Sequence, residues 1–131
     1  MLIIRKIVSL ISIFGLLIGS VTPCYADADN IVPAADEKSL RIDRLDNGAD
    51  VVRINNPGDD GTSVNGFDKY NTLDHGTIIS NNQYDLWVGD NKVTHNRNLY
   101  QEADRILFNV YSEEPSSLKG DTVIVGKNAE F

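Results

Sequence analysis

Carboxylates, two histidines and a Gly-Thr-Ser stretch are the side chains in this sequence whose types point to catalysis. Gly61-Thr62-Ser63-Val64-Asn65 departs from the nucleophile elbow of hydrolases, because Asn65 stands where that strained turn needs glycine. His75 and His95 lack a nearby serine or cysteine nucleophile in the sequence. Carboxylates are numerous, so a paired-carboxylate site of a polysaccharide-degrading enzyme stays open as an alternative. We assign no catalytic residue and expect no enzymatic activity.

Metal and cofactor chemistry has equally little support. One Cys and two His exclude a closed Cys/His zinc site and a disulfide framework. Asp59-Asp60-Gly61 has neither the EF-hand spacing nor the glycine-aspartate repeat of calcium-binding solenoids, so it indicates a solvated loop. No phosphate-binding or redox motif occurs. The expectation is no metal and no cofactor.

Charge and length exclude further classes of protein. The chain has 131 residues, which suits one small domain. Its 12 Lys and Arg against 19 Asp and Glu give a net charge of −7. That balance disfavours a nucleic-acid partner and a polybasic membrane anchor, both of which need a basic surface. The apolar fraction of 41% is too high for a wholly disordered chain.

The first 26 residues have the pattern of a secretory signal peptide. Arg5 and Lys6 precede an apolar run over residues 7–21, and Cys24-Tyr25-Ala26 resembles a cleavage site. The run is shorter than the roughly 20 residues that span a bilayer, so we expect cleavage after Ala26 in preference to an uncleaved anchor. Cleavage removes the only Cys. The destination is then outside the cytoplasm, by way of the bacterial periplasm.

The remainder has the pattern of short strands separated by turns. Residues 27–38 are predicted to be an extended lead-in. Short apolar clusters follow, several alternating with polar residues as half-buried strands do: Leu40/Ile42, Val51/Val52/Ile54, residues 77–79, Tyr84/Leu86/Val88, Ile106/Phe108/Val110 and Val123/Val125. Asn-Gly and Asp-Asn-Gly turns lie between them. The one helical candidate, residues 99–107, fits a turn or strand equally well. The residues predict an all-β fold and leave a parallel β-helix and a sandwich both open.

Residues 47–82 resemble a known family. They read NGADVVRINNPGDDGTSVNGFDKYNTLDHGTIISNN. The order of an Asn-Gly turn, a Val-Val-x-Ile strand, a Pro/Gly loop and a Ser-x-Asn-x-aromatic segment is similar to the N-terminal secretion domain of filamentous-hemagglutinin-type exoproteins. These are the secreted partners of two-partner (type V) secretion. The matching motif residues are Asn47, Gly48, Asn65, Phe67, Tyr70, Asn71 and Gly76.

A second block extends the resemblance over nearly all of residues 31–131. Asn96-Arg97-Asn98-Leu99 resembles the family's Asn-Pro-Asn-Leu motif, with Arg97 in place of proline. The family's next landmark, Asn-Pro-Asn-Gly, would follow Phe131, so residues 39–131 are expected to be a truncated secretion domain. A degenerate gene fragment and a small standalone surface adhesion module stay open as alternatives.

The resemblance implies a right-handed parallel β-helix, here partial, with a β-hairpin cap at its N-terminal end. It implies binding to the periplasmic (POTRA) modules of an outer-membrane transporter, and a secreted or cell-surface location. By family analogy, Asn96, Arg97, Asn98 and Leu99 form the transporter-recognition or early-folding motif. Adhesin and contact-dependent toxin parentage both stay open, as does binding to a host-cell surface. We expect a monomer.

Three expectations concern the remaining side chains. Asn65, Asn71, Asn81 and Asn98 are predicted to cap corners of the coil, because asparagine hydrogen-bonds nearby backbone groups in turns. The aromatic residues Phe67, Tyr70, Tyr84 and Trp87 are predicted to be core or cap residues and not a ligand platform. Glu113-Glu114 is predicted to be an exposed charged turn before Pro115.

Overall fold

The computed structural model describes residues 30–131, which form strands and loops without a helix. The predicted signal peptide lies outside the described residues. Within residues 30–131 we find no helical segment capable of spanning a bilayer. The strands are β1 (Ile31–Pro33), β2 (Arg41–Arg44), β3 (Asp50–Arg53), β4 (Thr62–Tyr70), β5 (Thr77–Asn81), β6 (Leu86–Val88), β7 (Asn91–Val93), β8 (Arg105–Val110) and β9 (Thr122–Gly126).

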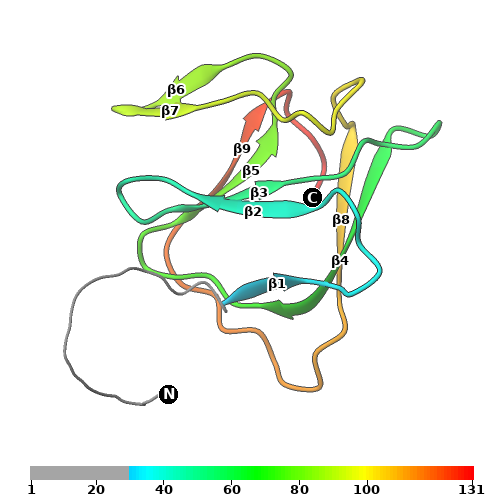
Figure 1. Ribbon diagram of the computed structural model, residues 1–131, viewed down its shortest axis with the longest axis vertical. Coiled ribbons are helices and arrows are strands. Elements are labelled where there is room, and N and C mark those ends of the chain that lie inside the picture. The colour runs from blue at the N-terminus through cyan, green and yellow to red at the C-terminus, as the bar shows by residue number, and fades with distance from the viewer. Residues whose placement is uncertain (1–29) are drawn as a thin grey trace.

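The chain winds between two sheets. In one sheet β3, β5 and β9 lie side by side in parallel, and in the other β4 and β8 pair in parallel (Figure 1). Each passage of the chain therefore stacks a new strand on the strand one coil earlier, which is the connectivity of a parallel β-helix. The expected all-β class and partial β-helix are confirmed, and the alternative of a sandwich is excluded.

Antiparallel strands close the N-terminal end of this solenoid. β2 pairs with β3 as a hairpin, and β1 pairs with β4. The hairpin turn is built by Asn47 and Gly48: the Asn47 carboxamide oxygen accepts from the Ala49 N–H at 3.0 Å, and Gly48 has a φ of 92°. Glu37 joins the cap to the coils, accepting from the Gly66 N–H at 2.6 Å and the Asn55 amide at 2.9 Å. The hairpin cap expected from the family resemblance is therefore present.

The inner core is built from rows of side chains that stack from coil to coil. Ile42, Val52, Ile79 and Ile124 occupy one row across β2, β3, β5 and β9. The two middle members are fully buried, while the members on the edge strands are only partly buried. Burial of this kind contributes about 25 cal/mol per Å² of apolar surface. Each coil is thus stabilised mainly by its neighbours in the stack.

The outer face of the β3-β5 sheet is buried too. Val51 and Ile78 point away from the inner core and pack against Val93 of the β6-β7 hairpin, with Leu86 and Val88 beside them. Every residue of β3 and β5 is buried as a result. Burial on both faces explains why the sequence has consecutive apolar residues in these strands, as buried parallel strands do.

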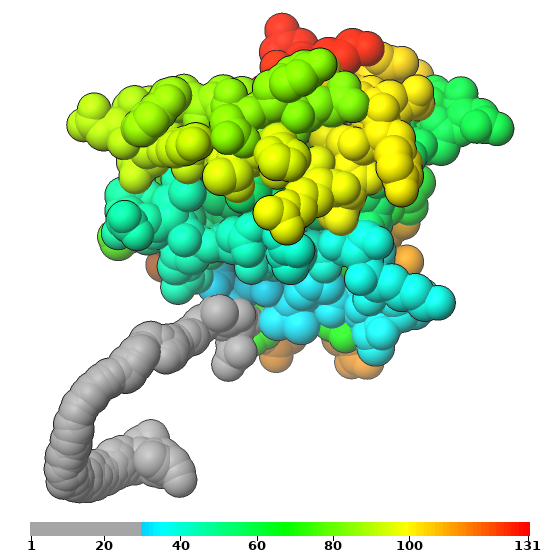
Figure 2. Space-filling view, turned by 45° about the horizontal axis from the view of Figure 1, so that its top comes forward, coloured from blue at the N-terminus to red at the C-terminus, as the bar shows by residue number. Residues whose placement is uncertain are grey.

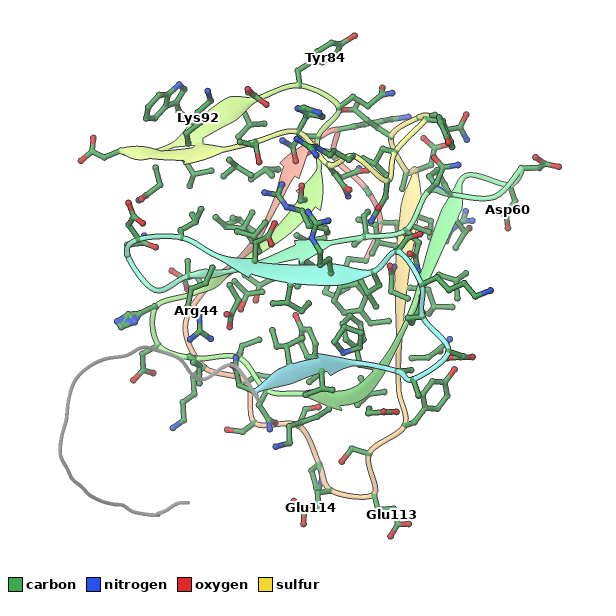
Figure 3. All side chains as sticks on the ribbon, in the orientation of Figure 1. Arg44, Asp60, Tyr84, Lys92, Glu113 and Glu114 are labelled. Carbon is green, nitrogen blue, oxygen red and sulfur yellow. The ribbon has the colours of Figure 1, made fainter. Side chains whose placement is uncertain are left out.

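Two expectations about particular segments were wrong or incomplete. β4 is the longest strand with nine residues, yet its polar composition gave no clear strand pattern in the sequence. Phe67 and Tyr70 are buried as predicted, but Trp87 is 66% exposed and Tyr84 80% exposed. The reason is that the β6-β7 hairpin turns one face to the coils and the other to solvent. Glu113 and Glu114 lie at an exposed bend, as predicted (Figure 3).

Gly126 and Gly89 provide a matched test of coil stacking. Both have positive φ, 90° and 59°. A Cβ added at Gly126 would lie 2.6 Å from the carbonyl carbon of Asn81 on the neighbouring coil. A Cβ added at Gly89 would meet no atom within 4 Å. We expect Gly126→Ala to lower the free energy of unfolding by about 3 kcal/mol or more, and Gly89→Ala by about 1–2 kcal/mol. Urea unfolding followed by far-UV circular dichroism measures both, and equal losses would contradict the assigned stacking.

Candidate functional site

The segment Asn96-Arg97-Asn98-Leu99 lies in the loop between β7 and β8, directly after the hairpin. Asn96 is 2% exposed and Leu99 8% exposed, whereas Arg97 is exposed and Asn98 half-buried. Leu99 belongs to the same core cluster as Phe67 and Tyr70. Most of the segment is therefore part of the interior, and Arg97 is the member that it presents to solvent.

The Asn96 amide fastens two adjacent coils to this loop. Its Nδ2 donates to the Ile54 carbonyl at 3.0 Å and to the Ser80 carbonyl at 2.8 Å. These carbonyls belong to the end of the β3 passage and to β5. Its Oδ1 accepts from the Asn98 N–H at 3.0 Å. Because every polar atom of the Asn96 side chain has a hydrogen-bond partner, burying this side chain costs little free energy. Removing it would destabilise the fold, because its partners would lose their hydrogen bonds.

Asn98 extends the connection to the N-terminal cap. Its Nδ2 lies 3.0 Å from the Ser39 carbonyl, 3.1 Å from that of Arg53 and 3.1 Å from that of Ile54. The segment between Lys38 and β2 is therefore tied to β3 through a side chain that lies 59 residues after Ser39 in sequence. Asn96 and Asn98 together connect their own loop to the β3 and β5 coils and to the segment before β2.

Arg53 supports the same loop from beneath. It is 6% exposed, donates to the Asp43 carboxylate at 2.9 Å, and donates to the Thr94 carbonyl at 2.6 Å and its hydroxyl at 2.9 Å. Asn82 also donates to the Thr94 carbonyl, at 3.1 Å. Sequence reasoning assigned no role to Arg53 or Asn82. The available signal was a charged residue inside the apolar strand Val-Val-Arg-Ile, since a buried charge needs a partner.

The predicted corner asparagines all bond to backbone groups. The Asn65 Oδ1 accepts from the Asn55 N–H at 2.9 Å, and the Asn71 Oδ1 accepts from the Ser117 N–H at 2.7 Å. Asn81 accepts from the Ala103 N–H at 2.8 Å and donates to the carbonyls of Ala103 and Lys127. The prediction that these residues bond to backbone groups is confirmed, although Asn65 does so from within β4 and not from a corner.

The motif residues Asn47 and Gly76 lie elsewhere. Together with His75, Thr77 and Val88 they line a cavity of about 150 Å³ beside β5 and β9. Gly76 has a φ of 93° in the turn before β5. Asn96 does not line this cavity, whereas Leu99 shares a core cluster with the aromatic residues Phe67 and Tyr70.

The aromatic group packs at the inner face of β4 and β8. The ring of Phe108 lies 4.7 Å from Phe67 and 5.3 Å from Tyr70, centroid to centroid, and Phe131 packs edge-on against it at 4.9 Å. Burial, with a smaller contribution from the Asp50 carboxylate, raises the pKa of Tyr70 to about 12. Tyr70 therefore acts as an apolar core residue at neutral pH.

The side chains considered for catalysis have other partners. His95 Nδ1 lies 3.0 Å from the Asp85 carboxylate, and neither histidine bonds to a serine or threonine hydroxyl within residues 30–131. Asp60 accepts from the Thr62 N–H at 3.0 Å and so closes its own turn. No cluster of three or more His, Cys, Asp or Glu side chains that could hold a metal ion occurs in the described part of the chain.

Comparison with known proteins identifies what the chain is similar to. No protein-family model matches it. It is 31% identical over 111 residues to "Filamentous hemagglutinin" of Bordetella pertussis (strain Tohama I), a match that covers 83% of this chain and 3% of that protein. It superposes on the crystal structure of the filamentous hemagglutinin secretion domain with a TM-score of 0.67 and 30% identity, covering 77% of this chain and 33% of that one. The resemblance found in the sequence motifs is thereby confirmed. The chain spans about a third of the solved domain.

Substitutions at Asn96 and Arg97 distinguish a role of the loop in folding from a role at its surface. Asn96→Ala leaves the buried Ile54 and Ser80 carbonyls without their donor, so we expect the free energy of unfolding to fall by about 2–4 kcal/mol. Arg97→Ala removes an exposed side chain and should change it by less than about 0.5 kcal/mol. Urea unfolding measures both. Asn96→Asp, which keeps the shape but loses the donor, should resemble Asn96→Ala, and a wild-type midpoint would refute the assigned role.

The ionisation of Tyr70 makes the free energy of unfolding depend on pH in the alkaline range. Its pKa is raised from 10.0 to about 12 in the folded chain, so the folded state holds this proton more tightly than the unfolded state. The stabilisation is complete below pH 10 and is lost as the pH rises from 10 to about 12. We expect a loss of roughly 2–3 kcal/mol across that window. Unfolding curves at the two ends of the window measure it, and Tyr70→Phe should lack this component.

Proposed function

We propose that this chain is an exported, non-enzymatic secretion domain that the periplasmic (POTRA) modules of an outer-membrane two-partner secretion transporter recognise. The observation that carries the proposal is the likeness to the filamentous hemagglutinin secretion domain over 77% of the chain. The chain reaches the periplasm through its predicted signal peptide, residues 1–26, cut after Ala26, and the transporter passes it to the cell surface or medium. The protein of which it forms part is an adhesin-like exoprotein.

The solenoid suits export as an unfolded chain. Each coil buries its apolar side chains against the preceding coil, so folding can proceed coil by coil as the polypeptide emerges. The antiparallel cap of β1 and β2 comes first in sequence and offers the first stacking surface. Folding on the outer side then withdraws the chain from the transporter and favours completion of export.

The candidate recognition segment contributes to this function in two ways. Its amides, the buried Asn96 and the half-buried Asn98, complete the first coils and act in folding. Its exposed member, Arg97, is available for contact with a partner, and the ion pairs among residues 30–131 do not include it. A recognition role therefore falls to Arg97, while the folding role falls to the asparagines.

Separate observations support the proposal that the chain is not an enzyme. The histidine with a carboxylate partner, His95, is 47% exposed on the hairpin side of the molecule, outside both described cavities. The larger cavity, of about 300 Å³, is lined by Leu107 and Phe131 together with the Arg105-Glu130 ion pair. The carboxylates of Asp85, beside His95, and of Glu130 are thus each paired with a basic group.

The transporter supplies the test. We expect the purified chain to bind, saturably, the isolated periplasmic modules of the two-partner secretion transporter of the source bacterium in biolayer interferometry. Co-expression with the intact transporter should release the chain into the medium, and a transporter without its periplasmic modules should not. A chain that shows a cooperative β-sheet melt yet fails to bind would refute the proposal.

A further inference from the structure

Two Asn-Gly sequences occur in this chain, Asn47-Gly48 and Asn65-Gly66. An asparagine that precedes glycine can lose its side-chain amide without an enzyme, because glycine has no Cβ to shield its backbone nitrogen from the asparagine side chain. The reaction requires that the asparagine side chain and the following N–H are both free to move. The structure gives the two sequences opposite surroundings, and this difference decides which of them can react in the folded chain.

Asn47-Gly48 lies in the turn between β2 and β3, where Asn47 is exposed and Gly48 is half-buried. Figure 2 shows this turn in turquoise at the left-hand surface, below the β6-β7 hairpin. The Asn47 Oδ1 accepts from the Ala49 N–H at 3.0 Å, and the Gly48 N–H donates to the Leu45 carbonyl at 2.9 Å. Both hydrogen bonds are local to the turn. A small opening of an exposed turn therefore frees the Gly48 nitrogen while the coils stay folded.

Asn65-Gly66 is enclosed within β4, and the side chain of Asn65 is 0% exposed. The Asn65 Oδ1 accepts from the Asn55 N–H at 2.9 Å, and its Nδ2 donates to the Ser63 hydroxyl at 3.0 Å. The Gly66 N–H donates to the Glu37 carboxylate at 2.6 Å. β4 itself lies between β1 and β8. Freeing the Asn65 amide together with the Gly66 N–H thus requires β4 to leave its sheet, which means unfolding of the coil.

The reaction forms a cyclic imide and then consumes water. At the exposed turn, the Gly48 backbone nitrogen bonds to the side-chain carbonyl carbon of Asn47, and the bond from that carbon to the amide nitrogen breaks. The amide nitrogen leaves as ammonia and carries away the proton of Gly48. Water then opens the imide: attack at the side-chain carbonyl gives aspartate, and attack at the main-chain carbonyl gives isoaspartate. An amide becomes a carboxylic acid, with no oxidation or reduction.

We propose that Asn47-Gly48 is a site of spontaneous deamidation in the folded chain, and that folding protects Asn65-Gly66 from the same reaction. The argument uses only the exposure of the two turns and strands and the hydrogen bonds listed for them. It is independent of any partner, so it stands apart from the function proposed above.

Deamidation at the two sites has different consequences. Isoaspartate at position 47 lengthens the backbone of the turn that aligns β2 with β3, beside the Arg44-Asp50 ion pair at 2.8 Å, and therefore loosens the N-terminal cap. Aspartate at position 65 places a carboxylate at a fully buried position, next to the Ser63 and Leu107 carbonyls to which the amide donates. A buried charge without donors is costly. A chain modified at Asn65 while unfolded therefore folds poorly, which limits how long the unfolded chain stays competent to fold.

Peptide mapping by mass spectrometry tests the proposal. The purified chain is incubated at mildly alkaline pH, either folded or in urea, and the converted fraction of each asparagine is followed with time. Methylation by an isoaspartyl methyltransferase identifies the isoaspartate product. In the folded chain we expect Asn47 to convert about tenfold or more faster than Asn65, because only Asn65 must wait for unfolding. In urea the two rates should be similar, since glycine follows both residues.

Asn47→Ser is the matched control. Serine keeps a side-chain oxygen to accept from the Ala49 N–H but has no amide to lose, so the folded variant should show no conversion at this turn. Asn65 should keep its slow rate in the variant, with far-UV circular dichroism as the check of its fold. Equal rates at the two sites under folding conditions overturn the protection assigned to β4. Conversion of Asn47 in urea but not in the folded chain overturns its assignment as the reactive site.

Discussion

Buried asparagine amides bonded to backbone carbonyls are the interaction on which the rest of this structure depends. A solenoid must turn its chain at every corner, and each turn leaves backbone groups without a strand partner. Asn65, Asn81, Asn96 and Asn98 supply those partners from side chains that lie within the stack. Without them the carbonyls at the ends of β3 and β5 would be buried and unsatisfied, at a cost of about 1–3 kcal/mol each.

This arrangement joins the loop both to the coils and to the hairpin. The loop that holds Asn96 and Asn98 closes the first coils and also forms the base from which the β6-β7 hairpin projects. Arg53, a buried cation in β3, fixes that base by bonding to Thr94 and Asp43. A surface built on such a base can exist only after the coils beneath it have formed. The hairpin is therefore positioned only in the folded chain.

The two faces of the β6-β7 hairpin have different surroundings. Val93 and its apolar neighbours cover Val51 and Ile78, which makes β3 and β5 buried on both sides. The other face keeps Trp87 in solvent within a frame of polar contacts. Covering the sheet requires only the inner face, so the residues of the outer face take no part in that packing.

The sequence by itself determined the all-β class, most strand positions, the Asn47-Gly48 turn and the bonding of the asparagines to backbone groups, because each follows from local preferences of residues for strand or turn. Motif order identified the family resemblance and with it the β-helix, which periodicity alone could not separate from a sandwich. Only the tertiary structure decided that β4 is a strand, that Arg53 is buried, and that Tyr84 and Trp87 lie outside. Those outcomes depend on which segments stack on one another, and contacts between residues forty or more positions apart leave no local pattern to read.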